Sequence, residues 1–435
     1  MIAKAPLAKT AQALRTGTLD LPEYIKVLCD KIDANEPQIQ AFVPETDRRS
    51  RLVREAADLQ KRFSDPVNRP PLYGIPVGIK DIFRVNGFPT HAGSSFPPDL
   101  FTGAEAACVT LLKEAGALIA GKTVTTEFAY FEPGPTRNPY NLNHTPGGSS
   151  SGSAAGVACG FFPLALGTQT IGSVIRPAAF CGIIGFKPSF DRIPTAGLLF
   201  FSKSLDHVGL FTQDLQGVEL ACSIMCRDWQ PVTPDDRLPM LGVPDGPYLE
   251  HASAEGLAAF EAQIKTLAQA GYQIKRVRMF ENFEALNQQH RQMMAAEAAQ
   301  EHADWFARYR GLYRPKTLEI LLKGQQVSAA ELDAARAARL QLRQQLTDLQ
   351  ADQGIDCWIS PPATGPAPEG IHATGNPIMN LPWTNTGLPT ITIPAGMSAN
   401  HLPLGFQCTA GFGQDEQLLA WMQGIQAALE HGAPH

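Results

Sequence analysis

The stretch GTQTIGSVIRPAAFCG, residues 167–182, is the part of the sequence that says most about the fold. An apolar run at 162–166 precedes it and predicts a buried strand, and Pro177 within it suits the first turn of a helix. We therefore expect a strand-to-helix turn here. The first N–H groups of a helix lack partners within the helix, so such a turn can bind an oxyanion, and Ser173 is a candidate nucleophile.

Strand and helix patterns alternate outward from this turn. Upstream, they predict helices at 21–35, 45–62, 104–115 and 154–161, and strands at 74–80, 117–120 and 162–167. Downstream, they predict a short apolar element at 177–184, helices at 255–270, 283–308 and 329–349, and strands at 357–360 and 389–394. No repeat or linker divides the chain, which indicates one large α/β domain over residues 1–435. We expect the site to lie in the core at 65–215 and 355–430, with a helical layer at 230–350.

The composition narrows the class of protein. The 435 residues are 44% hydrophobic and 18% charged, which allows a sizeable core. A net charge of −6 argues against nucleic acid or an anionic membrane as a partner. The eight cysteines form no CxxC pair and the ten histidines are dispersed, so we expect no metal site and no cofactor. Without a signal peptide or 18 consecutive apolar residues, the sequence predicts a cytoplasmic protein.

A serine-rich loop, PGGSSSGS at 146–153, has three competing interpretations. The first is a flexible polar turn. The second is a phosphate-binding loop, which would need Lys followed by Ser or Thr after its last glycine, and Ser153-Ala154 supplies neither. The third is a nucleophile elbow, because GSSSG at 148–152 matches G-x-S-x-G with Ser150 in the centre. That motif needs a preceding strand, and NLNHTP at 141–146 is a poor one.

A nucleophilic Ser173 would need a base to remove its proton. His207, which follows Asp206, is one candidate. Lys80 is the other, because it ends an apolar strand, where burial would lower its pKa and make it neutral. The residues by themselves leave both candidates open.

Three motifs, in this order and spacing, resemble the amidase signature family: GIKD at 78–81, PGGSSSG at 146–152, and the 167–182 stretch closed by GFKP at 185–188. Similarity continues through TEFA at 126–129, PTRNP at 135–139, SLDHVG at 204–209, NLPWT at 380–384, GLP at 387–389 and LPLGFQ at 402–407, and is weakest over 230–350. The resemblance implies an α/β fold with a mixed, twisted β-sheet covered by α-helices on both faces. It also implies a metal-independent hydrolase of amides, and sometimes of esters or carbamates.

The same resemblance implies a Ser-Ser-Lys triad. Ser173 would be the nucleophile, Ser149, held by a cis peptide, the bridging serine, and Lys80 the base. This choice makes His207 a structural, hydrogen-bonding residue.

Further residues are implied around the triad. The backbone N–H groups implied to bind the oxyanion are those of Thr170, Ile171, Gly172 and Ser173. Ser150 and Asp81 are candidates for hydrogen bonds that hold Ser149 and Lys80. The possible liners of the substrate pocket are Phe128, Tyr130, Phe131, Ile378, Met379 and Trp383, although apolar residues more often belong to the core.

Three departures from the family pattern G-T-D-T-G-G-S-x-R stand out. Gln169 replaces the aspartate, Ile171 replaces a glycine, and Arg176 comes one position later. One residue turns a helix by about 100°, so Arg176 should point elsewhere than the usual arginine. We interpret these changes as the loss of one supporting ion pair, and expect catalysis to survive because the oxyanion donors are backbone groups.

These expectations define an amidase that acts on a small or medium amide with an apolar or aromatic acyl group, as a monomer or homodimer. One alternative is a carbamate (urethane) or aryl-ester hydrolase that uses the same site. The other is a glutamine-hydrolysing amidotransferase subunit that works with a tRNA-linked partner. The acidic charge balance weighs against this last alternative.

Overall fold

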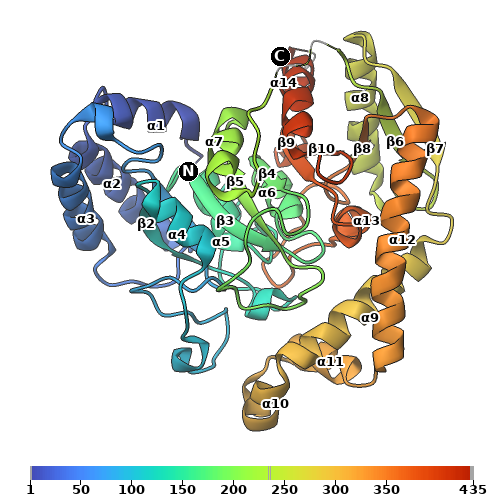
Figure 1. Ribbon diagram of the computed structural model, residues 1–435, viewed down its shortest axis with the longest axis horizontal. Helices are drawn as coiled ribbons and strands as arrows, with labels where there is room; N and C mark the ends of the chain where they lie inside the picture. The colour runs from blue at the N-terminus through green and yellow to red at the C-terminus, as the bar shows by residue number, and fades with distance from the viewer. Residues whose placement is uncertain (1, 234, 236, 432–435) are drawn as a thin grey trace.

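The computed structural model describes residues 2–233, 235 and 237–431. In that part of the chain, one ten-stranded sheet has the order β2-β1-β3-β5-β4-β9-β10-β8-β6-β7 (Figure 1). The strands are β1 (Pro76–Lys80), β2 (Leu118–Thr123), β3 (Leu164–Gln169), β4 (Ile184–Lys187), β5 (His207–Thr212), β6 (Leu241–Asp245), β7 (Ile274–Arg278), β8 (Cys357–Ser360), β9 (Thr390–Met397) and β10 (Pro403–Thr409).

Fourteen α-helices in the described residues flank this sheet. They are α1 (Leu7–Thr16), α2 (Leu21–Ile39), α3 (Arg48–Arg62), α4 (Ala107–Glu114), α5 (Ser151–Ala158), α6 (Ile175–Phe180), α7 (Leu215–Met225), α8 (Ala254–Gln269), α9 (Phe283–Glu301), α10 (Ala303–Tyr309), α11 (Pro315–Gly324), α12 (Ala329–Gln353), α13 (Leu381–Asn385) and α14 (Asp415–His431). The helix α5 packs against β1, β2 and β3, and α6 packs against β4, β9 and β10.

The sheet is mixed. Strand β1 pairs in parallel with β2 and β3, and the strands from β3 to β8 pair antiparallel. At the far edge, β6 is parallel to β8 and β7. The expected α/β fold with a single mixed sheet between helices is therefore confirmed.

The strands that carry the predicted site are buried along their whole length. Every residue of β1, β2 and β3 is buried. Parallel strands covered on both faces are typically apolar without alternation, which explains why they could be recognised in the sequence. The predicted strand at 357–360 coincides with β8.

The segment 230–350 differs from the expected helical layer, because it also contributes β6 and β7 to one edge of the sheet. Strand β7 reads IKRVR, and three of its residues are exposed. Charged side chains are common on edge strands, where they hinder further pairing, and they mask the apolar signal of a strand. The single helix predicted at 283–308 is two helices, α9 and α10, which meet at His302.

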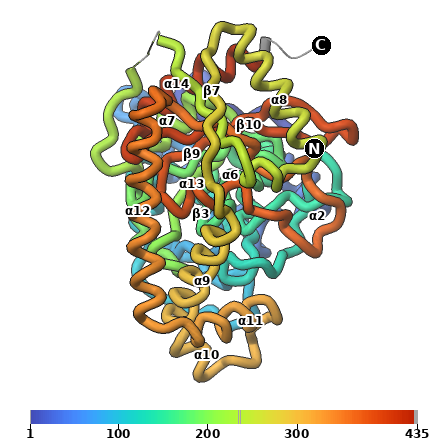
Figure 2. Tube along the Cα trace, turned by 90° about the vertical axis from the view of Figure 1, so that its right-hand side faces the viewer, coloured from blue at the N-terminus to red at the C-terminus, as the bar shows by residue number. Residues whose placement is uncertain are grey.

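The helices of this segment extend beyond the sheet. In Figures 1 and 2, α10 and α11 lie at the lowest end of the molecule, and α9 leads from them back towards the sheet. Helix α9 packs against α11, α12 and α13. This course brings side chains of α9 close to the turn between β3 and α6.

Candidate active site

Lys80 is the last residue of β1, and its side chain is 0% exposed. Its Nζ lies 2.7 Å from Ser149 Oγ and 2.8 Å from Thr168 Oγ1. Burial lowers the pKa of Lys80 from 10.5 to about 7, and the negative charge of Asp206 opposes this shift. A lysine with such a pKa is poised to act as a base near neutral pH.

Ser149 lies in the serine-rich loop that precedes α5. The peptide bond between Gly148 and Ser149 is cis. The next residue, Ser150, has its Oγ 3.3 Å from both the N and the O of Thr168. Ser150 therefore ties the loop to β3, the strand whose Thr168 hydroxyl also contacts Lys80.

Ser173 lies between β3 and α6, in the strand-to-helix turn that the sequence predicted. In the described part of the chain, its Oγ has no hydrogen-bond partner, and the backbone N–H groups of Ile171, Gly172 and Ser173 donate to no acceptor. Ser149 and Ser173 line the same cavity, but no hydrogen bond joins their hydroxyls. Catalytic contacts in a site without substrate are often longer than in the reacting complex. Free N–H groups beside a serine form the arrangement that stabilises an oxyanion.

Gln169 holds the start of α6. Its Oε1 accepts hydrogen bonds from the N–H groups of Val174 at 2.8 Å and Ile175 at 3.0 Å. Its Nε2 donates to Thr384 Oγ1 at 2.9 Å, and that hydroxyl donates to the carbonyl of Ile171 at 2.6 Å. The Thr384 hydroxyl uses its one proton in the bond to Ile171, so its oxygen must accept the hydrogen bond from residue 169. The amide of Gln169 can donate this bond, and an aspartate carboxylate could not.

Distant segments also hold this turn. The carbonyl of Thr170 accepts a hydrogen bond from His290 Nε2 at 3.1 Å, and the hydroxyl of Thr170 donates to Asp206 Oδ1 at 2.6 Å. A Cβ on Gly172 would lie 2.1 Å from Asn380 Oδ1. The turn can approach Asn380 only because residue 172 has no side chain.

The cavity between the two serines is narrow, with a volume of about 20 Å³, roughly the room of one water molecule. Its lining residues are Ala129, Tyr130, Phe131, Ser149, Thr170, Ile171, Ser173, Arg176, Phe201, Met294, Thr374 and Pro377. Aromatic and aliphatic side chains form one part of this wall, and hydroxyls with one guanidinium form the other.

Of the predicted pocket residues, Tyr130 and Phe131 line this cavity. The other four are buried elsewhere and do not line it: Phe128, Ile378, Met379 and Trp383. Phe128 packs among aromatic rings that include Phe96 and Trp305. Apolar side chains next to a site in sequence fill the core when the backbone turns them away from the cavity.

Arg176 is 1% exposed and lines the cavity beside Ser149. Its Nη2 donates to the carbonyl of Gly148 and to Thr374 Oγ1, and its Nη1 donates to the carbonyl of Gly375 at 2.7 Å. The guanidinium thus binds the carbonyl of the peptide unit that precedes Ser149, and it forms no hydrogen bond with Gln169.

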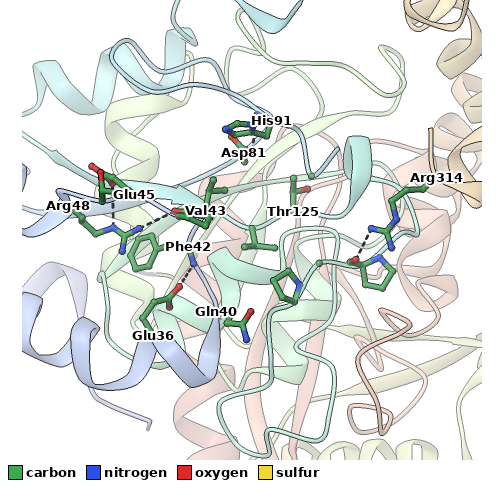
Figure 3. A pocket seen from close by; sticks show the side chains of 17 residues that line it. Glu36, Gln40, Phe42, Val43, Glu45, Arg48, Asp81, His91, Thr125 and Arg314 are labelled. Carbon is green, nitrogen blue, oxygen red and sulfur yellow. Dashed lines mark hydrogen bonds and ion pairs between the residues drawn. The ribbon is translucent and has the colours of Figure 1, made fainter. Parts of the chain in front are cut away.

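Asp81 does not hydrogen-bond Lys80, in contrast to what the sequence suggested. Its Oδ1 pairs with Lys122 Nζ at 2.7 Å, and its Oδ2 accepts from the N–H of His91 at 3.0 Å. Asp81 lines a second cavity of about 700 Å³, where Figure 3 shows it next to His91. No residue of the predicted triad lines this larger cavity, so the two cavities are separate.

His207 lies on β5, opposite Gln169 in the sheet register. Its Nδ1 bonds to the carbonyl of Leu205, and burial holds its pKa well below the usual range, so the ring is neutral. It does not line the cavity of Ser149 and Ser173. Between the two candidate bases, the one that contacts a serine of this cavity is Lys80.

The described residues contain no group of three or more His, Cys, Asp or Glu side chains that could hold a metal ion. The eight cysteines are free and buried. None of the helices in the same part of the chain has the length and apolar character needed to cross a membrane. The groups placed for chemistry around the cavity are hydroxyls, one amine and one guanidinium.

Known proteins resemble this chain in sequence and in fold. A family model described as Amidase matches residues 23–419. The chain is 30% identical over 466 residues to a subunit of the glutamyl-tRNA(Gln) amidotransferase of Roseiflexus sp. (strain RS-1), covering 95% of this chain and 94% of that protein. A crystal structure of an amidase is 28% identical with a TM-score of 0.86, covering 97% of this chain and 99% of that one. A peptide amidase from Stenotrophomonas maltophilia, 23% identical, has the same fold with a TM-score of 0.81 over 98% of this chain and 97% of its own.

With the family match across nearly its whole length, the chain belongs to the amidase signature family. It is an amide hydrolase that acts on C–N bonds.

Several residues at the site were not predicted from the sequence. Thr168, His290 and Thr384 contact Lys80, Thr170 and Gln169. The unpredicted residues that line the cavity are Ala129, Phe201, Met294, Thr374 and Pro377. Thr168 lies in the 167–182 stretch, on β3, which pairs with the strand β1 that ends in Lys80. Its position in this motif was the signal that could have identified it. His290 and Met294 belong to α9, in the segment where the sequence suggested few catalytic residues. Nothing local in α9 marks them: His290 bonds to Thr170, 120 residues away in the chain, and Met294 lines the cavity.

Proposed function

We propose that the protein hydrolyses a carboxamide through an acyl-Ser173 intermediate, with Lys80 as base and Ser149 as proton relay. The observation that carries this proposal is the 2.7 Å contact between the buried Lys80 Nζ and Ser149 Oγ, at a cavity that Ser173 also lines.

In the first half-reaction, neutral Lys80 accepts the proton of Ser149, and Ser149 accepts that of Ser173. Thr168 Oγ1 accepts a hydrogen bond from the same amine at 2.8 Å, which holds Lys80 Nζ in place beside Ser149. The Ser173 oxygen attacks the carbonyl carbon, and the oxyanion binds the N–H groups of Ile171, Gly172 and Ser173. One such donor lowers a barrier by about 2.7–4 kcal/mol.

Collapse of the tetrahedral intermediate breaks the C–N bond, the leaving amine takes the proton from Lys80 through Ser149, and the acyl-Ser173 ester remains. In the second half-reaction, water attacks this ester, and the same relay accepts a proton from the water. The free acid leaves and Ser173 regains its proton. Each group ends in its starting state, so no external reactant other than water is consumed.

The test is a turnover panel of aliphatic amides, anilides, carbamates and p-nitrophenyl esters, with Ser173→Ala as the control. We expect wild-type hydrolysis of at least one amide, a burst of p-nitrophenol from the esters, and a mass increase on Ser173 by the acyl group. Residual turnover by Ser173→Ala at the wild-type rate would overturn the assignment of the nucleophile.

Carbamate or aryl-ester hydrolysis is the nearest alternative, because the acyl-enzyme chemistry is the same. The panel separates these activities by their kcat/KM values. An enzyme whose preferred substrate is a urethane would show its highest kcat/KM with the carbamate members.

The similarity to the Roseiflexus protein suggests another alternative, a glutamine-hydrolysing amidotransferase subunit. The net charge of −6 weighs against association with tRNA. We propose instead that the protein acts alone, as a monomer or homodimer. Light scattering gives the mass of the purified protein, and glutaminase activity far above other amidase activities, or copurifying subunits, would favour the amidotransferase.

A further inference from the structure

Asp206 is a buried carboxylate that immediately precedes β5 and is held by neutral groups. Its Oδ1 accepts a hydrogen bond from Thr170 Oγ1 at 2.6 Å, and its Oδ2 accepts from the N–H groups of Phe201 at 2.7 Å and Ser202 at 3.0 Å. Among the described residues, no Lys, Arg or His side chain lies within ion-pair distance of this carboxylate. The protein therefore fixes Asp206 in place without pairing it with a cation.

The sheet places Asp206 and Lys80 on either side of β3. Strand β3 lies between β1, which ends in Lys80, and β5, which follows Asp206. Thr168, in β3, contacts Lys80 Nζ at 2.8 Å, and Thr170, two residues further along, contacts Asp206. Side chains two residues apart in an extended segment point to the same face of a sheet. The amine and the carboxylate therefore lie on one face, at the end of β3 that leads to Ser173.

Lys80 and Asp206 interact through their charges, although no hydrogen bond joins them. The direct contacts of Lys80 are neutral hydroxyls, those of Ser149 and Thr168. Burial lowers the pKa of Lys80 to about 7 and raises the pKa of Asp206 to about 6, and the attraction between the two groups opposes both shifts. Because both side chains are buried, little water screens this attraction.

The other titratable groups around the site do not supply a negative charge to Lys80. Asp81 pairs with Lys122 at 2.7 Å, which compensates its charge. His207 and His290 are neutral, because burial holds the pKa of each ring well below its usual range. Arg176 lines the cavity as a cation and disfavours a second positive charge there. In this part of the described chain, the anion that can balance a protonated lysine is Asp206.

The charge of Lys80 changes during the proposed reaction. When Ser173 attacks, its proton passes to Ser149 and the proton of Ser149 passes to Lys80, so that the neutral amine becomes an ammonium ion. A carboxylate attracts this ion far more than it attracts the neutral amine. Asp206 would therefore stabilise the transition state more than the resting state, which is the condition for a faster chemical step.

We infer that Asp206 is the counter-charge of Lys80 while Lys80 holds the proton, and that through Thr170 it also fixes the turn that carries Ser173. The inference rests on the proposed function, in which Lys80 is the base. Asp206 also holds the N–H of Phe201, a residue that lines the cavity. Because Asp206 acts through these groups and not on the reacting atoms, it is a positioning residue.

The first test is Asp206→Asn, which keeps the shape of the side chain and removes its charge. The amide oxygen can still accept from Phe201 and Ser202, and the Thr170 hydroxyl can turn to accept from the amide nitrogen. On a neutral amide we expect the midpoint of the kcat/KM profile to move to lower pH by about one unit, because no negative charge favours the ammonium form. Above this midpoint the rate should fall by about 10-fold, because Lys80 is then a weaker base.

Glu297→Gln is the matched control. Glu297 is also buried and holds the same loop, because it accepts from Ser202 and Ser204, but its charge is paired with Arg336. This variant should lose stability and keep the wild-type midpoint. An unchanged midpoint in Asp206→Asn would overturn the inference. An equal shift in both variants would also overturn it, since the cause would then be a displaced loop.

The second test follows Lys80 itself by NMR in protein labelled with 13C at lysine Cε, with the resonance assigned by its absence from Lys80→Ala. In the wild type this resonance should report two ionisations, a smaller change as Asp206 ionises near pH 6 and its own near pH 7. In Asp206→Asn it should report one, at lower pH. A wild-type resonance that fits a single ionisation would overturn the inference without any variant at position 206.

The two tests separate this inference from the proposed function. If Ser173→Ala hydrolyses amides at the wild-type rate while the Lys80 resonance responds to Asp206, the proposed function is refuted and the interaction of the two charges is supported. If activity depends on Ser173 and Lys80, but this resonance titrates identically in Asp206→Asn and the wild type, the function is supported and the inference is refuted. Circular dichroism and the melting temperature show that each variant is folded.

Discussion

His290, on α9, donates a hydrogen bond from its Nε2 to the carbonyl of Thr170, 3.1 Å away, and so connects the helical segment to the turn that carries Ser173. Its Nδ1 accepts from Asn385 Nδ2 at 3.2 Å, which defines the tautomer. Burial lowers the pKa of His290 to about 3, so the ring stays neutral over the working pH range. His290 is a positioning residue, because it acts on the reacting groups through Thr170.

Replacing His290 by Ala should lower kcat by about 10- to 100-fold with a smaller change in KM, because a small displacement of the oxyanion donors weakens transition-state binding. Stability should fall by about 1–3 kcal/mol, since the carbonyl of Thr170 loses its buried partner. Steady-state kinetics and urea unfolding measure the two effects. His290→Gln, which can still donate to Thr170, should recover part of kcat; equal activity of His290→Ala and wild type would refute the role.

The rate should depend on the ionisation of Lys80. Its pKa is about 7 in the folded protein, and only the neutral amine accepts a proton. We therefore expect kcat/KM to be low at pH 5, to rise through about pH 7 and to level above it. A pH profile measured on a neutral amide checks this, with Lys80→Ala as the inactive control. A flat profile between pH 5 and 9 would contradict Lys80 as the base.

Gln169→Asp should reduce both activity and stability. The shorter side chain withdraws from the N–H groups of Val174 and Ile175, and its carboxylate meets Thr384 Oγ1, whose proton already bonds to Ile171. A loss of about 1–3 kcal/mol is expected for buried polar groups left without partners. Urea unfolding measures the loss of stability, and steady-state kinetics measure the fall in kcat.

Gln169→Glu is the matched comparison for this change, because it keeps the length of the side chain and alters only the charge. If Gln169→Asp loses more stability and activity than Gln169→Glu, the effect comes from the shorter side chain. If the two variants lose equally, the effect comes from the negative charge. An unchanged Gln169→Asp enzyme would contradict the network described for Thr384.

Gly172→Ala should abolish most of the activity. The new Cβ would lie 2.1 Å from Asn380 Oδ1, so either the turn or Asn380 must move. A displacement of about 1 Å near reacting groups can lower a rate by about 100-fold. The control is Gly311→Ala, where an added Cβ meets nothing within 4 Å. Normal kcat in Gly172→Ala would show that the turn tolerates a side chain there.

The sequence by itself determined the features that depend only on short stretches of neighbouring residues. The strand-turn-helix around Ser173 and the buried strand that ends in Lys80 are short segments in which apolar runs, glycines and Pro177 mark the structure directly. The α/β class followed because such patterns alternate along most of the chain.

Only the tertiary structure decided how distant residues meet. Thr384 bonds to Gln169 across 215 residues and His290 bonds to Thr170 across 120. No local pattern records such a contact, because it exists only when the sheet order and the course of α9 bring both ends together. The same holds for Arg176, whose residue type was visible in the sequence. That it is a cation without a counter-ion became clear only from the neutral groups that surround it.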